Sequence, residues 1–117
     1  MTPLQVEKTI RHYIDGRFKN DNQTLSERYS ERIIKKMCFG DLKLSIQASD
    51  YHYCSPRKDC DYYYEVEVGF PNFYFSEGFI HRYADDIDTP QDTVYAYVPI
   101  SELSKEISEK LNSGDNN

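Results

Sequence analysis

The chain has 117 residues, of which 38% are hydrophobic and 15% aromatic, with eleven Tyr, six Phe and no Trp. This length is typical of one domain, and no apolar run approaches the roughly 18 residues of a membrane-spanning helix, so we expect no insertion into a membrane. The N-terminal residues lack the basic and apolar regions of a secretion signal. We therefore expect a cytoplasmic protein with reduced cysteines.

Charge is distributed unevenly along the chain, whose formal net charge is -6. Residues 1–58 carry eleven Lys or Arg against seven Asp or Glu, whereas residues 59–117 carry three against thirteen. The first half is thus positive by four charges and the second negative by ten. Two interpretations remain open: basic helices neutralise neighbouring acidic strands, or one end of the molecule binds a charged partner.

Two helices are predicted in the N-terminal part. Thr2, followed three residues later by Gln5, forms a capping-box signal, and apolar residues at helical spacing then predict a helix over 3–15. A second capping box precedes apolar residues at every fourth position as far as Met37. This pattern predicts another helix over 24–38.

The hydrophobic period changes to two from residue 42 onward. Alternating patterns predict strands over 42–48, 62–68 and 93–98, of which the first two form a hairpin. The aromatic segment 73–83 predicts either a further short hairpin or an irregular segment. Apolar residues at helical spacing over 100–111 predict a C-terminal helix.

This order of elements predicts an α+β domain over 1–112, followed by a flexible tail over 113–117. We expect an antiparallel sheet of three to five strands, with two N-terminal helices and one C-terminal helix mainly on one face. The other face of such a sheet lies in water. Simple alternation places Tyr63, Glu65, Glu67, Tyr95 and Tyr97 there, together with Lys43 and Gln47.

The wet face and the polar loop over 84–92 form the main candidate binding site. Tyrosine is favoured at protein interfaces because its ring is apolar and its hydroxyl can hydrogen-bond. Asp85, Asp86 and Asp88 in the loop resemble a row of phosphates and suit a basic nucleic-acid-handling protein.

The hypothesis that follows is a small, acidic, non-enzymatic interaction protein that binds and inhibits a macromolecular partner. Compact acidic domains of this kind occur among inhibitors from phages and mobile elements. They include nucleic-acid mimics that act on defence nucleases such as CRISPR effectors. This comparison rests on compactness and acidity alone, and no sequence motif supports it.

An alternative hypothesis is a nucleic-acid-binding protein that uses the basic face of helix 24–38. The residues of this face are Arg28, Arg32, Lys35 and Lys36. Helical spacing would let them follow a phosphate backbone. Glu27 and Glu31 interrupt the face, and the overall acidity of the chain opposes such binding.

A second alternative is a small thiol- or zinc-dependent enzyme centred on Cys54 and Cys60. His52 adjoins them, and Cys38 or His81 could complete a ligand set for zinc. The spacing differs from that of zinc fingers and ribbons, and no nucleophile elbow or phosphate-binding glycine loop occurs. The prediction is therefore no catalytic residue, no metal ligand and no cofactor.

Overall fold

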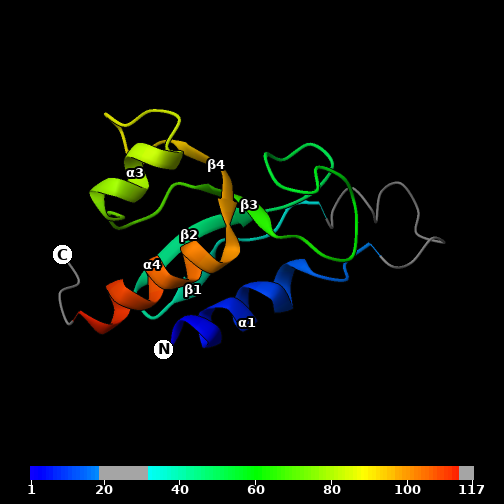
Figure 1. Cartoon of the computed structure of the whole chain (residues 1–117), viewed down its shortest axis with the longest axis horizontal. Helices are drawn as coiled ribbons and strands as arrows, with labels where there is room; N and C mark the ends of the chain where they lie inside the picture. The colour runs from blue at the N-terminus through cyan, green and yellow to red at the C-terminus, as the bar shows by residue number, and fades with distance from the viewer. Residues whose placement is uncertain (19–31, 114–117) are drawn as a thin grey trace.

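The computed structural model describes residues 1–18 and 32–113. Its elements are α1 (Pro3–Ile14), β1 (Met37–Phe39), β2 (Leu42–Gln47), β3 (Glu65–Gly69), α3 (Glu77–Tyr83), β4 (Val94–Pro99) and α4 (Ile100–Asn112) (Figure 1). The strands form a four-stranded antiparallel sheet in the order β1-β2-β3-β4. The predicted α+β class and antiparallel sheet are confirmed.

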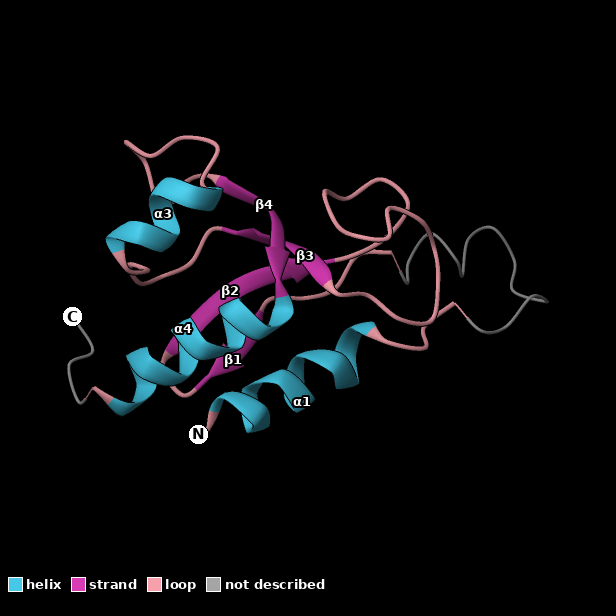
Figure 2. Cartoon of the chain, in the orientation of Figure 1, coloured by secondary structure: helices cyan, strands magenta, loops and turns pink. Residues whose placement is uncertain are grey.

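The two long helices, α1 and α4, lie side by side on one face of the sheet, and α3 packs against β4 (Figure 2). Their buried apolar side chains are Val6, Ile10, Ile14, Ile100, Leu103 and Ile107. Each such side chain contributes about 1.5–3 kcal/mol to folding when it leaves water. Within the ranges that the structure describes, no helix is long and apolar enough to span a membrane.

The first helix forms as its capping signal predicts. The Gln5 N–H donates to the Thr2 hydroxyl at 3.2 Å, and the Thr2 N–H donates to Gln5 Oε1 at 2.8 Å. These two bonds satisfy amide groups that the first turn leaves without helical partners. The prediction of a helix over 3–15 is confirmed to within one residue by α1.

The prediction of a helix over 24–38 is wrong where it can be checked. Residues 24–31 lie outside the described part of the chain, and residues 32–36 are not helical. Met37–Phe39 is a strand, in which Met37 and Phe39 are buried and Cys38 is exposed. Antiparallel pairing with β2 has therefore overridden the local helical pattern.

The turn between β1 and β2 requires glycine at residue 40. Gly40 has a φ of 59°, and a Cβ atom added there would lie 3.3 Å from Leu111 Cδ2. We expect Gly40→Ala to lower the free energy of unfolding by about 1–2 kcal/mol, because an L-residue is strained in this region. Urea titration would measure the change. Gly78→Ala in α3 is the matched control and should stabilise by up to about 1 kcal/mol.

The pairing of β3 with β4 contains a β-bulge. Two residues of β4, Ala96 and Tyr97, stand opposite Glu67 alone. Tyr97 has a φ of 52°, which is uncommon for a residue other than glycine. The extra residue reverses the alternation, so Tyr95 is 0% exposed whereas Tyr97 is 41% exposed. The prediction that Tyr95 lies on the wet face is therefore wrong.

Tyr63 is also buried, with an exposure of 0%, which contradicts its predicted place on the wet face. The reason is that β3 begins only at Glu65, later than the predicted strand over 62–68. Before it, the Tyr63 hydroxyl donates to the Lys58 carbonyl at 2.6 Å and accepts from the Cys60 N–H at 3.2 Å. The preceding loop therefore wraps around the Tyr63 ring.

The predicted short hairpin over 73–83 is wrong, and the alternative of an irregular segment holds only for residues 73–76, because Glu77–Tyr83 forms α3. Phe79 is the buried residue of α3, and its ring lies 4.3 Å from that of Phe75 and 5.9 Å from that of Tyr95, between centroids. Contacts at helical spacing between Phe75, Phe79 and Tyr83 favour this conformation.

Candidate functional site

The face of the sheet opposite α1 and α4 carries two half-buried carboxylates, Glu65 and Glu67. A loop lies against both of them. The Tyr53 N–H donates to Glu67 Oε1 at 3.2 Å, and the Ser55 hydroxyl donates to Glu65 Oε1 at 2.6 Å. Both predicted carboxylates therefore lie on one face, where each of them holds the loop in place.

The same loop brings a second tyrosine beside Tyr97. The Tyr97 N–H donates to the Tyr53 carbonyl at 3.0 Å, and the two ring centroids are 6.0 Å apart. The Arg57 guanidinium lies over the Tyr53 ring at 4.9 Å from its centroid. Tyr53 is 46% exposed. We call the set Tyr53, Arg57, Glu65, Glu67 and Tyr97 the tyrosine patch.

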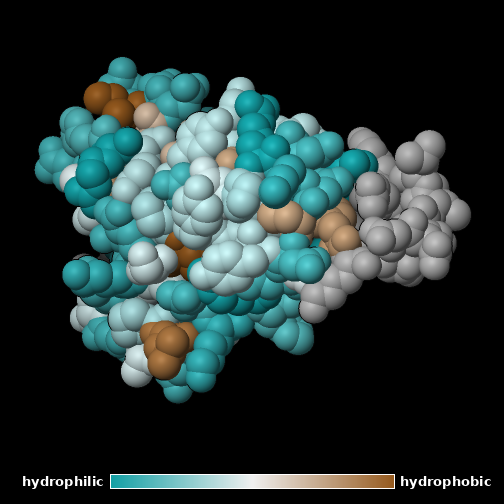
Figure 3. Space-filling view, turned by 45° about the vertical axis from the view of Figure 1, so that its right-hand side comes forward, coloured by the Kyte–Doolittle hydropathy of each residue, from teal (hydrophilic) through white to brown (hydrophobic). Residues whose placement is uncertain are grey.

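The tyrosine patch is ordered and amphipathic, a combination typical of protein interfaces. On the face shown in Figure 3, strongly apolar residues form only small separate areas, and residues of intermediate hydropathy occupy the centre. The patch contains three residues that the sequence predicted: Glu65, Glu67 and Tyr97. It also contains Tyr53, which the sequence prediction missed. The density of tyrosine around residues 51–53 was the only local signal.

The acidic residues Asp85, Asp86 and Asp88 lie exposed on the loop between α3 and β4. The Asp85 N–H donates to the Val94 carbonyl at 2.9 Å, at the start of β4. Tyr97 lies in the second half of the same strand, and the loop that carries Tyr53 lies on the other side of β4 (Figure 1). The structure therefore places the acidic loop and the tyrosine patch in separate regions.

The basic residues predicted for helix 24–38 do not form one helical face in the described part of the chain. Arg28 lies outside the described residues. Arg32 binds two carboxylates, Asp50 at 3.0 Å and Asp59 at 2.8 Å, and so ties the segment before β1 to the loop after β2. Lys35 and Lys36 are exposed just before β1. The helical spacing on which the nucleic-acid hypothesis depended is absent from residues 32–38.

Cys54 and His52 lie in a buried cluster around Ser49. Cys54 Sγ is 3.1 Å from the Ser49 carbonyl oxygen, and burial raises the pKa of this thiol. His52 Nδ1 lies 2.6 Å from Ser49 Oγ, and burial lowers the pKa of the imidazole. A buried thiol of raised pKa is typical of a structural cysteine. Across residues 1–18 and 32–113, no three His, Cys, Asp or Glu side chains are grouped to hold a metal ion.

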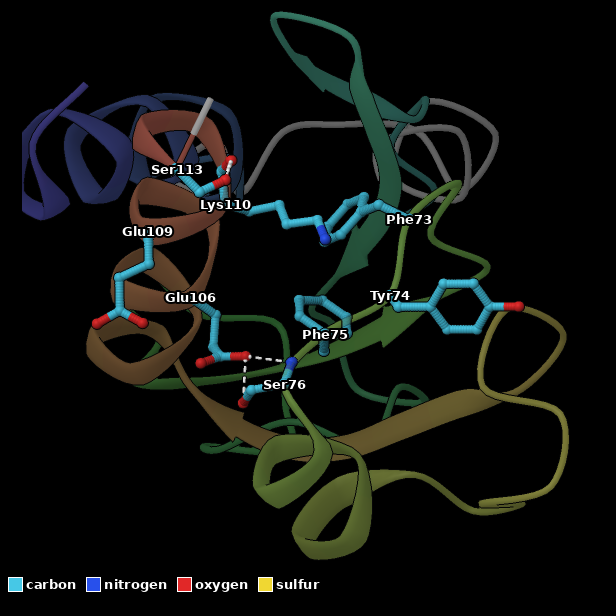
Figure 4. Close-up of a pocket in the computed structure, with 8 residues that line it drawn as sticks. All are labelled: Phe73, Tyr74, Phe75, Ser76, Glu106, Glu109, Lys110 and Ser113. Atoms are coloured by element: carbon cyan, nitrogen blue, oxygen red, sulfur yellow. Dashed lines mark hydrogen bonds between the residues drawn. The ribbon is translucent and has the colours of Figure 1, made fainter. Parts of the chain in front are cut away.

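A hollow of about 360 Å³ lies between residues 73–76 and the end of α4 (Figure 4). Phe73 and Phe75 line it on one side, and Lys110 extends toward them from α4. Glu106 accepts hydrogen bonds from the Ser76 N–H at 3.0 Å and the Ser76 hydroxyl at 2.8 Å. These bonds fasten segment 73–76 to α4, which gives Glu106 a structural role.

The tyrosine patch thus joins two exposed tyrosines to charged side chains from β3 and the loop after β2, and it includes three of the predicted site residues. The acidic loop is exposed but separate from it, and the buried cysteine and histidine form part of the loop's own structure. Comparison with protein-family models, with curated proteins and with solved structures gives no match to this chain.

Proposed function

We propose that this chain is a non-enzymatic interaction protein that binds a protein partner through the tyrosine patch. The observation that carries the proposal is the paired exposure of Tyr53 and Tyr97, at 46% and 41%, in a surface held by hydrogen bonds. Each ring can bury a large area in a partner while its hydroxyl still forms a hydrogen bond.

The backbone of the patch supports this proposal. Tyr97 sits at a bulge with a positive φ, a conformation that costs about 1–3 kcal/mol and concentrates at functional sites. The Tyr97 N–H and the Glu67 carboxylate both bind the segment around Tyr53. Rings that are already positioned lose less conformational freedom when a partner binds, which favours affinity.

We extend the proposal to inhibition of a basic, nucleic-acid-handling partner. The second half of the chain is negative by ten charges, and three of its carboxylates, on Asp85, Asp86 and Asp88, lie exposed on one loop. A basic groove that normally binds phosphates would attract this loop. The hypothesis of a phage or mobile-element inhibitor rests on this charge and on the general likeness to the compact acidic domains found among such inhibitors.

The test uses the tagged full chain to capture proteins from the native host. We expect the combined substitutions Tyr53→Ala and Tyr97→Asn to weaken binding of the captured partner about 30-fold or more, the cost of losing one interface hot spot. Asn tolerates the left-handed backbone at residue 97. Binding of the purified partner would be measured by calorimetry, and circular dichroism would confirm the fold.

Tyr74→Ala is the matched control, because Tyr74 is also exposed but belongs to the segment beside α4. It should leave partner affinity unchanged. Equal affinities for the wild type and the double variant would refute the patch as the binding surface. Inhibition is tested separately on the partner's own activity, where Asp85→Asn, Asp86→Asn and Asp88→Asn should weaken inhibition at low salt.

A further inference from the structure

The outer edge of the sheet is longer than β1 itself. Met37 pairs with Leu44, and the same register continued by three residues places Ile34 opposite Gln47. There the Gln47 side chain accepts from the Ile34 N–H at 2.9 Å and donates to the Ile34 carbonyl at 2.6 Å. The Gln47 side-chain amide thus takes the place of the backbone hydrogen bonds that would continue the pairing. Residues 34–39 therefore run beside β2.

The other side of segment 34–39 faces no strand in the described sheet, where β1 pairs with β2 alone. Among residues 1–18 and 32–113, no backbone hydrogen bond between segments involves residues 33–40 outside this pairing. An edge of this kind offers unpaired N–H and C=O groups to a further strand.

A groove accompanies this edge. It has a volume of about 480 Å³ and lies between Thr9 and Tyr13 of α1 and the segment from Ile34 to Cys38. Tyr13, Ile34 and Met37 supply apolar surface to it. A sheet edge flanked by a helix with an apolar groove between them is a geometry that holds an extended peptide as an added strand.

The charge of the groove indicates what it binds. Lys35 and Lys36 belong to its lining and are exposed, whereas no Asp or Glu occurs among its described lining residues. Neither lysine forms an ion pair with a carboxylate in the described ranges of the chain. In a chain of net charge -6, this is a local basic site beside an apolar one.

We propose that this groove binds an extended acidic segment of a partner protein, which adds as a strand to the edge formed by residues 34–39. Backbone hydrogen bonds to the edge hold the segment, its apolar side chains enter the groove, and the positive charge of Lys35 and Lys36 attracts its carboxylates. This second interaction surface is independent of the tyrosine patch.

Two other occupants fit the groove less well. A nucleic acid would use the lysines but not the unpaired backbone edge or the apolar lining of Tyr13 and Met37. A second copy of the chain would bring the same short β1 and the same two lysines to the contact, and that edge offers the groove no acidic strand. An acidic peptide uses all three features of the site.

The experiment uses the full chain and a fluorescent nine-residue peptide in which Glu and Val alternate. We expect binding by fluorescence anisotropy, backbone amide shifts confined to residues 34–39 and their neighbours in NMR spectra, and slower alkylation of the exposed Cys38 thiol. A matched peptide with Lys in place of Glu should bind at least about tenfold more weakly. A Glu/Val peptide with alternate backbone amides methylated should lose binding, since it cannot form the strand.

Lys35→Glu with Lys36→Glu should weaken binding of the Glu/Val peptide about tenfold or more, through like-charge repulsion. Lys58→Glu with Lys105→Glu makes the same charge change at exposed sites outside the groove and should leave affinity within about twofold. The proposal is overturned if the amides of 34–39 do not shift, if the Lys or methylated peptide binds equally well, or if duplex RNA or self-association occupies the edge instead. None of these results depends on the tyrosine patch.

Discussion

Tyr95→Ala should lower the free energy of unfolding by about 3–5 kcal/mol, the range for removing a large aromatic side chain from a core. The Tyr95 ring is 0% exposed, and its centroid lies 5.2 Å from that of Phe75 and 5.9 Å from that of Phe79. Its hydroxyl donates to the Pro90 carbonyl at 2.6 Å. The alanine variant would therefore lose ring packing between α3 and β4 and leave a cavity in its place.

The matched control lies two residues away on the same strand. Tyr97→Ala removes the same atoms from a side chain that is 41% exposed, at an unchanged positive φ, and should cost less than about 1 kcal/mol. Chemical denaturation of both variants would measure the difference. Similar destabilisation by the two substitutions would contradict the bulge, because simple alternation puts both tyrosines on the same side.

The fold should also lose stability at alkaline pH through its buried tyrosines. Burial raises the pKa of Tyr95 from its usual value of 10.0 to about 12. Between these two pH values the unfolded chain loses the Tyr95 proton while the native protein keeps it, so rising pH favours unfolding. Within this range the free energy of unfolding falls by up to about 1.4 kcal/mol per pH unit. The stability that the neutral Tyr95 contributes is fully present below pH 10. Burial raises the pKa of Tyr63 as well and adds a loss in the same direction.

Tyr95→Phe separates this effect from the titration of exposed groups. It keeps the ring but removes the hydroxyl, so near pH 8 it should cost about 1 kcal/mol for the lost hydrogen bond to Pro90. Between pH 9.5 and 11.5 the wild type should then lose about 2 kcal/mol more than the variant, by linkage. Urea titrations across this range would measure both stabilities. Parallel curves would show that Tyr95 ionises equally easily in the native and unfolded chains.

The two proposed surfaces depend on different parts of the sheet. The tyrosine patch requires the loop after β2 and the bulge in β4, whereas the groove beside β1 requires the Gln47 side chain and α1. The patch offers two positioned tyrosine rings, and the groove offers a sheet edge beside two lysines. Each surface can be removed by substitutions that leave the other intact, so their contributions to binding can be measured independently.

Local signals in the sequence predicted the elements that have a capping motif or a regular hydrophobic period. The capping box at Thr2 and Gln5 begins α1, and the apolar stripe over 100–111 forms α4. Alternation predicted β2, β3 and β4 approximately and hence the α+β class. Glu65, Glu67 and Tyr97 were correctly placed on the exposed side of the sheet, although Glu65 and Glu67 are only half exposed.

The sequence by itself thus determined the fold class, most of the element order and the residues available for a binding face. Tertiary structure decided which tyrosines occupy that face, because the bulge reverses the alternation between Tyr95 and Tyr97, and the loop around Tyr63 delays the start of β3 to Glu65. It also decided that residues 37–39 form a strand, since pairing with β2 outweighs a helical pattern that could be read locally. These outcomes depend on contacts between distant residues, which periodicity along the chain does not contain.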